Sequence, residues 1–232
     1  MPRCFAALSL LALCATSVVL VSGPTPLRAQ GAQSGTASAE TLARSLQQHY
    51  DKIRDFKATF EQTTAGGALN LSSKGEGTVE VKKPGRMRWV YTKPDKSLLV
   101  SDGVHIYNCF LDTKQPECDA PADVPSGDDA PSAALFLAGK GDILRDFKVA
   151  RVESPVRNTL ALRLDPRKVD PDYEYLVVAF DPDTYLIRGL KTRDRQASDT
   201  TIVFNNIKTN TNIPDSTFKF TPPAGAKTKL PR

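Results

Sequence analysis

The sequence predicts a mainly β (α+β) protein in which a large antiparallel sheet curls into a barrel or half-barrel. About ten short apolar runs recur at regular spacing between turn residues, and few stretches have a helical period. The 17 Pro and 14 Gly are scattered without a period, which excludes a repeat array. Hydrophobic residues make up 40% of the chain and charged residues 25%, as in ordinary globular proteins, which excludes a disordered chain.

Charge and the supply of reactive side chains exclude further classes of protein. The 31 Lys and Arg against 26 Asp and Glu give a net charge of only +5, so we expect no nucleic-acid partner. The two His and four Cys leave little for a metal site, and the motifs GxSxG, HExxH, GxxxxGK(S/T) and GxGxxG are absent from the sequence. His49 and His105 are interpreted as packed or half-exposed rather than as catalytic bases. The residues therefore predict neither an enzyme nor a cofactor.

Residues 1–29 have the layout of a secretory signal peptide. The run from Cys4 to Val21 carries no charge, and Ala29 ends a small-residue cleavage site. An uncleaved anchor helix is the alternative, because the apolar run is long for a signal. Residues 30–38 are small and polar and are interpreted as a flexible leader, so the folded domain is expected over 39–232, in the periplasm.

Cys109 and Cys118 are the two cysteines that follow the signal. An even count in an exported chain predicts a disulfide between them, which would stabilise the fold by roughly 2–3 kcal/mol. Two independent buried thiols are the alternative. The spacing is not that of a CxxC redox motif.

A helix is predicted to begin at Ala39, and the chain is expected to pass into a strand near Lys57. Gly66-Gly67 and Gly75–Gly77 are predicted to be turns around a first hairpin. The helix is indicated by one stripe of side chains at three- and four-residue steps. The stripe consists of Leu42, Leu46, His49, Tyr50, Ile53 and Phe56.

The middle of the chain is predicted to be a series of strands. Lys82–Gly85 has turn composition, and Met87, Trp89 and Tyr91 then alternate with residues of the opposite face. Asp102-Gly103 lies between two apolar runs, which is the strongest short-range signal of a β-hairpin.

The second half begins with a loop rich in Pro and Asp over 119–131. A short, almost wholly apolar helix is predicted over 132–138, ending at Gly139, with a second helical piece over 142–144. A tight turn is expected at 181–184. Strands are expected over 147–152, 160–164, 173–180, 185–190 and 200–204.

Two sets of side chains could form a binding site. A basic group could hold a phosphate or lipid headgroup, or could be a solvated strand edge; it consists of Lys82, Lys83, Arg86 and Arg88. An aromatic set could line a cavity or fill a core; it consists of Tyr50, Phe56, Phe60, Trp89, Tyr91 and Phe136. A curled sheet with an apolar interior and a helical cover favours a dry pocket for a hydrophobic ligand.

Three stretches of the sequence resemble the LolA family, the periplasmic carriers of outer-membrane lipoproteins in Gram-negative bacteria. They are DFKATFEQ (55–62), GEGTVEVKKPGRMRWVYTKPDKSLLVSDG (75–103) and FKFTPPAG (218–225). The resemblance implies an unclosed antiparallel β-barrel with a helical lid over a hydrophobic cavity for acyl chains, without enzymatic activity or cofactor. It implies cargo taken from an inner-membrane ABC transporter of the LolCDE type and passed to an outer-membrane receptor. We expect a monomer.

The resemblance also implies roles for particular residues. At or near the cavity it places Tyr50, Phe60, Met87, Trp89, Leu99 and Ile106. On the lid it places Leu135, Phe136 and Leu137. The family commonly has an Arg before the turn proline, where it can hold the lid shut; this chain has Lys83 there, so either Lys83 is a weaker latch or Arg86 replaces it. The pair Cys109 and Cys118 is not part of the family pattern.

Two other functions remain as alternatives. A periplasmic lipid-binding or envelope-stress sensor protein could use the same fold, although such regulators usually carry an additional C-terminal domain and this chain is short after Pro223. An exported hydrolase would need a site that the motifs above do not supply.

Overall fold

The protein is described by a computed structural model, which covers residues 37–67, 71–112, 115–124, 137, 139, 141–171 and 173–229. Its helices and strands are, in chain order, α1 (Ala39–Asp51), β1 (Asp55–Gly66), β2 (Leu71–Lys82), β3 (Arg86–Lys93), β4 (Ser97–Asp102), β5 (His105–Phe110), β6 (Glu117–Asp119), β7 (Ala122–Asp123), α3 (Ile143–Asp146), β8 (Phe147–Val152), β9 (Leu160–Pro166), β10 (Tyr175–Phe180), β11 (Ile187–Arg193), β12 (Ser198–Thr209), the 3₁₀-helix η2 (Asp215–Phe218) and β13 (Lys227–Lys229). The predicted mainly β composition is confirmed.

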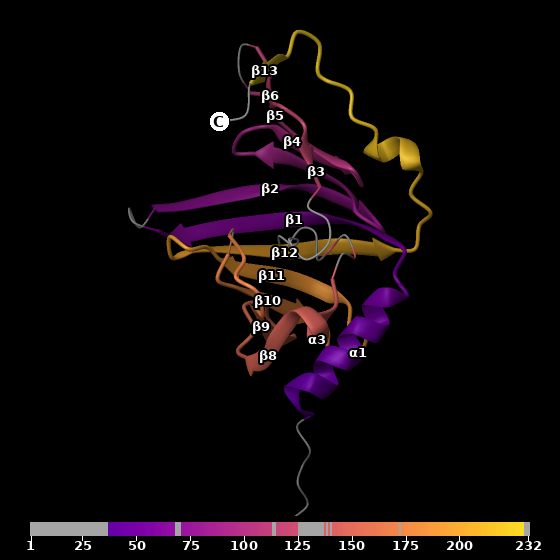
Figure 1. Cartoon of the computed structure of the whole chain (residues 1–232), viewed down its shortest axis with the longest axis vertical. Coiled ribbons are helices and arrows are strands. Elements are labelled where there is room, and N and C mark those ends of the chain that lie inside the picture. The colour runs from indigo at the N-terminus through magenta and orange to yellow at the C-terminus, as the bar shows by residue number, and fades with distance from the viewer. Residues whose placement is uncertain are drawn as a thin grey trace, which may run out of the picture. The chain divides into compact units, whose positions relative to one another are not determined.

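The strands form one large sheet in the order β13-β6-β5-β4-β3-β2-β1-β12-β11-β10-β9-β8 (Figure 1). In the described part of the chain, neighbouring strands are antiparallel except β13 and β6, which are parallel, and β7 pairs with β5 beside this order. The order begins at β13 and ends at β8, so the sheet is not closed on itself. This confirms the predicted unclosed antiparallel architecture.

Helix α1 begins at a Ser38 cap, whose hydroxyl accepts a hydrogen bond from the backbone N–H of Thr41 at 3.2 Å. Its apolar stripe packs inward, and α1 lies beside α3 and β8 (Figure 1). The predicted helix is too long, because Phe56 belongs to β1. Asp55, which is 2% exposed, accepts hydrogen bonds from backbone N–H groups of the segment after β12, which draws the chain into the sheet before Phe56.

The prediction of a turn at Gly75–Gly77 is wrong, because β2 runs through these residues without interruption. Gly77 stands opposite Tyr91 at a register shift between β2 and β3. A Cβ atom on Gly77 would lie 2.0 Å from the carbonyl oxygen of Val90 and 3.0 Å from the Phe60 ring. The glycine therefore permits a close approach inside the sheet rather than a turn.

The two other predicted turns in this region are confirmed. Lys82–Gly85 joins β2 to β3, and Asp102 with Gly103 joins β4 to β5. Gly103 has a φ of 99°, and the Asp102 carboxylate accepts the backbone N–H groups of Val104 at 2.8 Å and His105 at 2.7 Å. The Asp102 side chain therefore stabilises the turn, and Gly103 supplies the positive φ that the turn requires.

In the second half of the chain β8 has the predicted bounds, β9 and β12 are longer than expected, β10 is shorter, and β11 is shifted towards the C-terminus. The predicted signal, the leader up to residue 36 and most of the apolar helix over 132–138 lie outside the described residues, so these predictions stay untested. The described residue Leu137 is helical. In the part of the chain that the structure describes, no helix is long and apolar enough to cross a membrane.

Apolar side chains form two clusters on opposite faces of the sheet. The inner cluster joins α1, Leu137 and most strands; Leu99 packs against it from β4. The outer cluster lies on the other face of β3–β6, because Leu98 and Val100 alternate with Leu99. It is formed by Leu98, Val100, Cys109 and Cys118, with Val90, Leu111, Phe220 and Ala226 packed against them.

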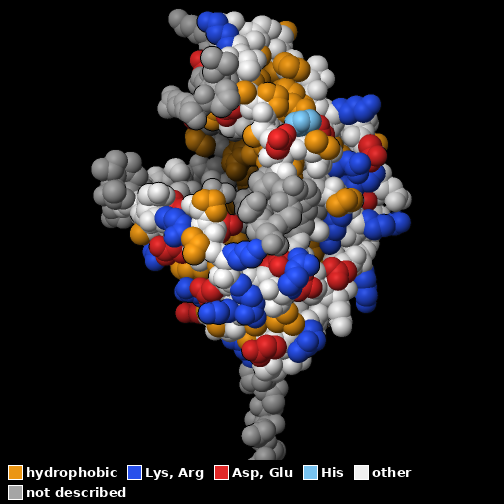
Figure 2. Space-filling view, in the orientation of Figure 1, with side chains coloured by type: hydrophobic (Ala, Val, Ile, Leu, Met, Phe, Trp, Pro, Cys, Tyr) orange, Lys and Arg blue, Asp and Glu red, His pale blue; other side chains and the backbone are white. Residues whose placement is uncertain are grey.

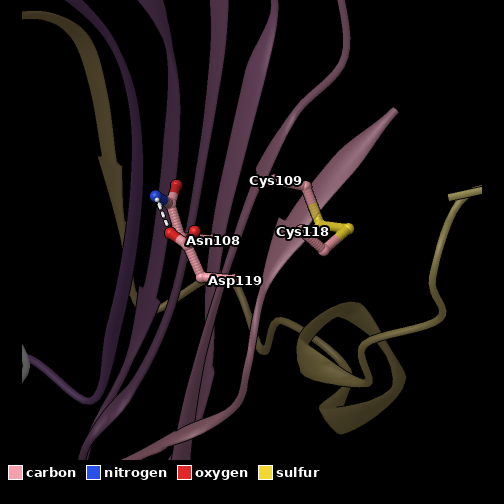
Figure 3. The surroundings of a disulfide bond; sticks show 4 residues. All are labelled: Asn108, Cys109, Cys118 and Asp119. Carbon is pink, nitrogen blue, oxygen red and sulfur yellow. Dashed lines mark hydrogen bonds between the residues drawn. A yellow bond between two sulfur atoms is a disulfide. The ribbon is translucent and has the colours of Figure 1, made fainter. Parts of the chain in front are cut away.

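A disulfide joins Cys109 and Cys118 in the outer cluster and confirms the predicted pairing (Figure 3). The two cysteines stand directly opposite each other on β5 and β6. The next pair of residues, Asn108 and Asp119, is joined by a hydrogen bond of 2.9 Å from the amide to the carboxylate (Figure 3). Phe220 then stacks on Tyr107 with ring centroids 4.4 Å apart, so the segment before β13 covers this face.

Candidate functional site

A small apolar cavity lies in the inner cluster, between α1 and the β1, β11 and β12 part of the sheet. Its enclosed volume is about 10 Å³, although the empty space between its walls, mouth included, is about 280 Å³. The walls are Tyr50, Ile53, Phe56, Leu137, Leu186, Ile187, Phe204, Ile207 and Thr209. Figure 2 shows that hydrophobic side chains gather towards β3–β6, whereas charged ones surround α3 and β8.

Tyr50 connects the last turn of α1 to the segment that contains Leu137. Its side chain is 3% exposed, and its hydroxyl donates a hydrogen bond to the backbone carbonyl of Leu137, which is itself 1% exposed. Burial raises the pKa of the Tyr50 hydroxyl, so it stays protonated and remains a donor. Both residues line the cavity, so this hydrogen bond holds one wall of the cavity to another.

Lys83 lies in the turn between β2 and β3 and contacts Tyr50. Its Nζ atom donates a hydrogen bond to the backbone carbonyl of Tyr50 and lies 3.4 Å from the centroid of the Tyr50 ring. Its aliphatic stem packs against Gly139, where a Cβ atom would lie 2.6 Å from Lys83 Cδ. A residue larger than glycine at position 139 would therefore displace the lysine.

Burial lowers the pKa of Lys83 to about 8, although the charge of Asp51 raises it. The carbonyl, the ring and the carboxylate near Nζ therefore compensate only partly for the hydration that the ammonium group loses. Arg86, the second predicted latch residue, lies elsewhere: its Nη1 atom is 3.9 Å from the carboxylate of Asp215 in η2. The structure thus brings Lys83, rather than Arg86, against Gly139.

Aromatic rings form the wall that continues from the cavity along the inner face. Phe204 lines the cavity and lies 6.3 Å from Phe56 and 6.2 Å from Trp89, measured between ring centroids. Phe60 completes the group, in edge contacts with Trp89 at 5.0 Å and Tyr91 at 4.9 Å. These rings come from β1, β3 and β12, so the sheet must curl to bring them together.

The structure brings the six residues predicted for the cavity into or against one cluster, but among them the cavity walls include only Tyr50. Phe60, Met87 and Trp89 are buried in the core beside it, and Leu99 and Ile106 are partly buried against the same cluster. Of the predicted lid residues, Leu137 lines the cavity, whereas Leu135 and Phe136 lie outside the described residues.

The walls that sequence reasoning missed come mostly from β11 and β12. The expected strand over 200–204 ends too early, because β12 continues through a β-bulge. Asn206 has a φ of 54°. Two residues of β12, Asn206 and Ile207, lie between the residues that pair with Thr59 and Lys57, where β1 has only one residue. The bulge returns Ile207 to the inner face. The sequence does contain a signal of this bulge: a pair of asparagines is followed by Ile207 and Thr209, which lie two residues apart as on one face of a strand.

Comparison with known proteins adds an independent finding. The family model described as "Outer membrane lipoprotein carrier protein LolA" matches residues 51–221. A relative from Nitrosospira multiformis named outer-membrane lipoprotein carrier protein is 27% identical over 78% of this chain and 84% of that protein. A protein of the same name from Pseudomonas putida is 30% identical over 82% of this chain and 88% of that protein. Among solved structures, a LolA-superfamily protein from Nitrosomonas europaea is similar over 79% of this chain and 98% of that chain, with 11% identity and a TM-score of 0.41.

Proposed function

Because this chain belongs to the LolA family of outer-membrane lipoprotein carrier proteins, we propose that it binds the acyl chains of lipoproteins released from the inner membrane and delivers them to the outer membrane. It would receive its cargo from an inner-membrane ABC transporter of the LolCDE type and pass it to an outer-membrane receptor. It would act in the periplasm as a monomer, after cleavage near Ala29, and catalyse no reaction.

The observation that carries the proposal is an apolar cavity that the described residue Leu137 covers, with Gly139 next to it; these two residues are called the cover. Leu137 closes the cavity through the Tyr50 hydrogen bond, and Gly139 rests on the stem of Lys83. An acyl chain gains about 0.8 kcal/mol per buried methylene, so an apolar interior can hold it without a specific polar contact. A cargo that binds the opened interior shifts the equilibrium from closed to open.

The enclosed volume of about 10 Å³ is far below the roughly 300–1,000 Å³ of typical ligand pockets. Cargo must therefore displace the cover, and Leu137 is the described residue that stands in its way. In this proposal Tyr50 and Lys83 hold the cover to α1 and to the turn between β2 and β3. Binding and release are then governed by how easily these contacts separate.

The proposal is tested with a synthetic triacylated lipopeptide that carries a fluorophore, and with the same peptide without acyl chains. We expect one acylated peptide to bind per protein and the bare peptide not to bind, by fluorescence anisotropy. Ile207→Glu places an unpaired carboxylate in the cavity wall and should abolish binding. Ile202→Glu is the matched control, because Ile202 is also partly buried on β12 against the inner cluster but is not a cavity wall.

Equal loss of binding in both variants, with the fold intact by circular dichroism, would place the acyl chains elsewhere on the inner face. Binding of diacyl phospholipid as tightly as lipopeptide would favour a general lipid-binding protein. Absence of binding to any acylated probe would contradict the carrier proposal. Transfer of a bound lipopeptide to outer-membrane vesicles then tests the direction of delivery.

A further inference from the structure

The single tryptophan of the chain has an unused hydrogen-bond donor in the apolar interior. Trp89 is 5% exposed on β3, and its indole Nε1 is buried without a hydrogen-bond partner among the residues that the structure describes. Most buried polar groups in proteins are paired, because a desolvated donor without an acceptor destabilises the fold. A phenylalanine would fill much of this space without that penalty, so the N–H group calls for a functional explanation.

Trp89 has apolar neighbours on several sides. The ring packs against Phe60 at 5.0 Å and Phe204 at 6.2 Å, and its partners across the sheet are Val79 and Leu99. Tyr91, two residues along the same strand, differs: its hydroxyl donates to Gln62 Oε1 at 2.8 Å. Within the described part of the chain, the Tyr91 hydroxyl thus has an acceptor and the Trp89 indole N–H has none.

Trp89 also lies next to the cavity. Phe204 is both a wall of the cavity and a ring neighbour of Trp89, so one side chain separates the indole from the space that an acyl chain would enter. An acyl chain that displaced Leu137 and packed along the Phe204 ring would meet Trp89 in the same apolar cluster.

We propose that the Trp89 N–H group is the polar anchor of the binding site and donates a hydrogen bond to the carbonyl oxygen of an ester-linked fatty acyl chain. This inference rests on the function proposed above and names the cargo's chemistry within it. An indole N–H is a donor only, so its partner must be an acceptor. A neutral ester carbonyl meets that need, whereas a carboxylate or phosphate would bring an unpaired charge into an apolar interior.

The anchor makes the site select acyl chains over alkyl chains of the same length. Both bury the same methylene groups, but only the ester offers the carbonyl that pairs the donor. An analogue without the acceptor leaves the N–H group unpaired, so a site with a buried donor discriminates against it. The net free energy of one ordinary hydrogen bond corresponds to an affinity for the ester about fivefold to tenfold higher than for the alkyl analogue.

The test compares two lipopeptides that differ only in their glyceryl linkages, two palmitoyl esters in one and two hexadecyl ethers in the other. Calorimetry should give the wild-type protein an affinity for the ester about fivefold to tenfold above that for the ether. Trp89→Phe should bind both equally, at the affinity of the wild type for the ether. Tyr91→Phe is the control, and its preference for the ester should equal that of the wild type.

A direct measurement needs no variant. Because the chain has one tryptophan, its ¹⁵N–¹H spectrum contains a single indole resonance. Saturation with the ester lipopeptide should move the indole proton downfield, and the ether should not. If both lipopeptides bind the wild type with equal affinity and the indole proton does not move downfield with the ester, the anchor is wrong and the carrier function stands. If neither binds, the carrier function itself fails.

Discussion

The inner and outer apolar clusters lie on opposite faces of one sheet, but they are held together by different means. The outer cluster contains a disulfide, and the polypeptide before β13 packs over it through Phe220. The inner cluster contains the cavity, where Leu137 accepts the Tyr50 hydrogen bond and Gly139 contacts Lys83. The outer face is crosslinked covalently, whereas the contacts of Leu137 and Gly139 on the inner face are noncovalent.

This difference suggests a division of labour within the sheet. A carrier needs an interior that opens, and opening is compatible with a stable fold only if the strands themselves stay in place. The disulfide lies between β5 and β6, far along the sheet order from the cavity walls on β11 and β12. Removing the disulfide and removing the Tyr50 hydrogen bond should therefore separate stability from binding.

The largest effect is expected from Phe204→Ala, which removes a ring that is 2% exposed and lines the cavity. Deleting a buried Phe side chain lowers the free energy of unfolding by about 3–5 kcal/mol. Phe220→Ala in the outer cluster should lower it by only about 1 kcal/mol, because that ring is partly exposed and mainly loses its stacking on Tyr107. Urea denaturation of both variants measures the difference, and similar losses would contradict the contrast between the clusters.

Removing the disulfide should affect stability without affecting binding. The chain-entropy model gives a loss of about 2–3 kcal/mol for Cys109→Ala with Cys118→Ala. Affinity for the triacylated lipopeptide should stay within about twofold of the wild type, because distant sites act independently. The wild-type protein with the disulfide reduced is the control. A large loss of affinity in folded protein would show that the outer cluster is coupled to the cavity.

Tyr50→Phe should affect lipopeptide exchange more than stability. It deletes the hydroxyl that donates to the Leu137 carbonyl and keeps the ring that lines the cavity. Losing one net hydrogen bond of about 1 kcal/mol should raise the rate of lipopeptide exchange about fivefold, with a small change in the urea midpoint. Tyr91→Phe is the matched control, because its partner is Gln62. Equal exchange rates in Tyr50→Phe and the wild type would remove Tyr50 from the closing contacts.

The smallest effect is expected from pH and acts through Lys83. Burial lowers the pKa of Lys83 to about 8 in the closed structure, whereas an exposed lysine titrates near 10.4. Opening that exposes Nζ therefore takes up a proton between these values, so raising the pH from 7 to 8.5 should favour the closed form about fourfold. Lipopeptide association should slow accordingly.

Lys83→Arg supplies the control for this pH dependence, because a guanidinium group stays charged throughout the range. Its association rate should not change between pH 7 and 8.5 beyond the change seen in Lys83→Met. Association that speeds up in the wild type as the pH rises would have the wrong sign and contradict the assignment.

Much of the fold was predictable because local patterns agree with the sheet. Alternation at Met87 and Trp89 gave β3, and Asp102 with Gly103 gave the hairpin that follows it. The errors occurred where a distant segment overrides the local pattern. Asp55 is held by the chain after β12, and Gly77 is needed because Val90 and Phe60 approach it.

The site was less predictable than the fold. Tyr50 and Leu137 could be named, but the walls Ile207 and Thr209 depend on a bulge at Asn206 that shifts the phase of β12. The environment of Lys83 depends on Gly139, which lies far from it in sequence, so neither its packing nor its lowered pKa can be read from neighbouring residues.

The pairing of β13 with β6 has a consequence for the order in which the sheet is completed. Thr228 pairs with Cys118, so the strand beyond the disulfide is contributed by residues that leave the ribosome after the other described strands. Until then β6 presents an open edge, which can pair with other chains. β13 then covers this edge with a three-residue strand that carries Lys227 and Lys229. Short, lysine-bearing edges resist further pairing, so the growing sheet is protected against aggregation at its final step of assembly.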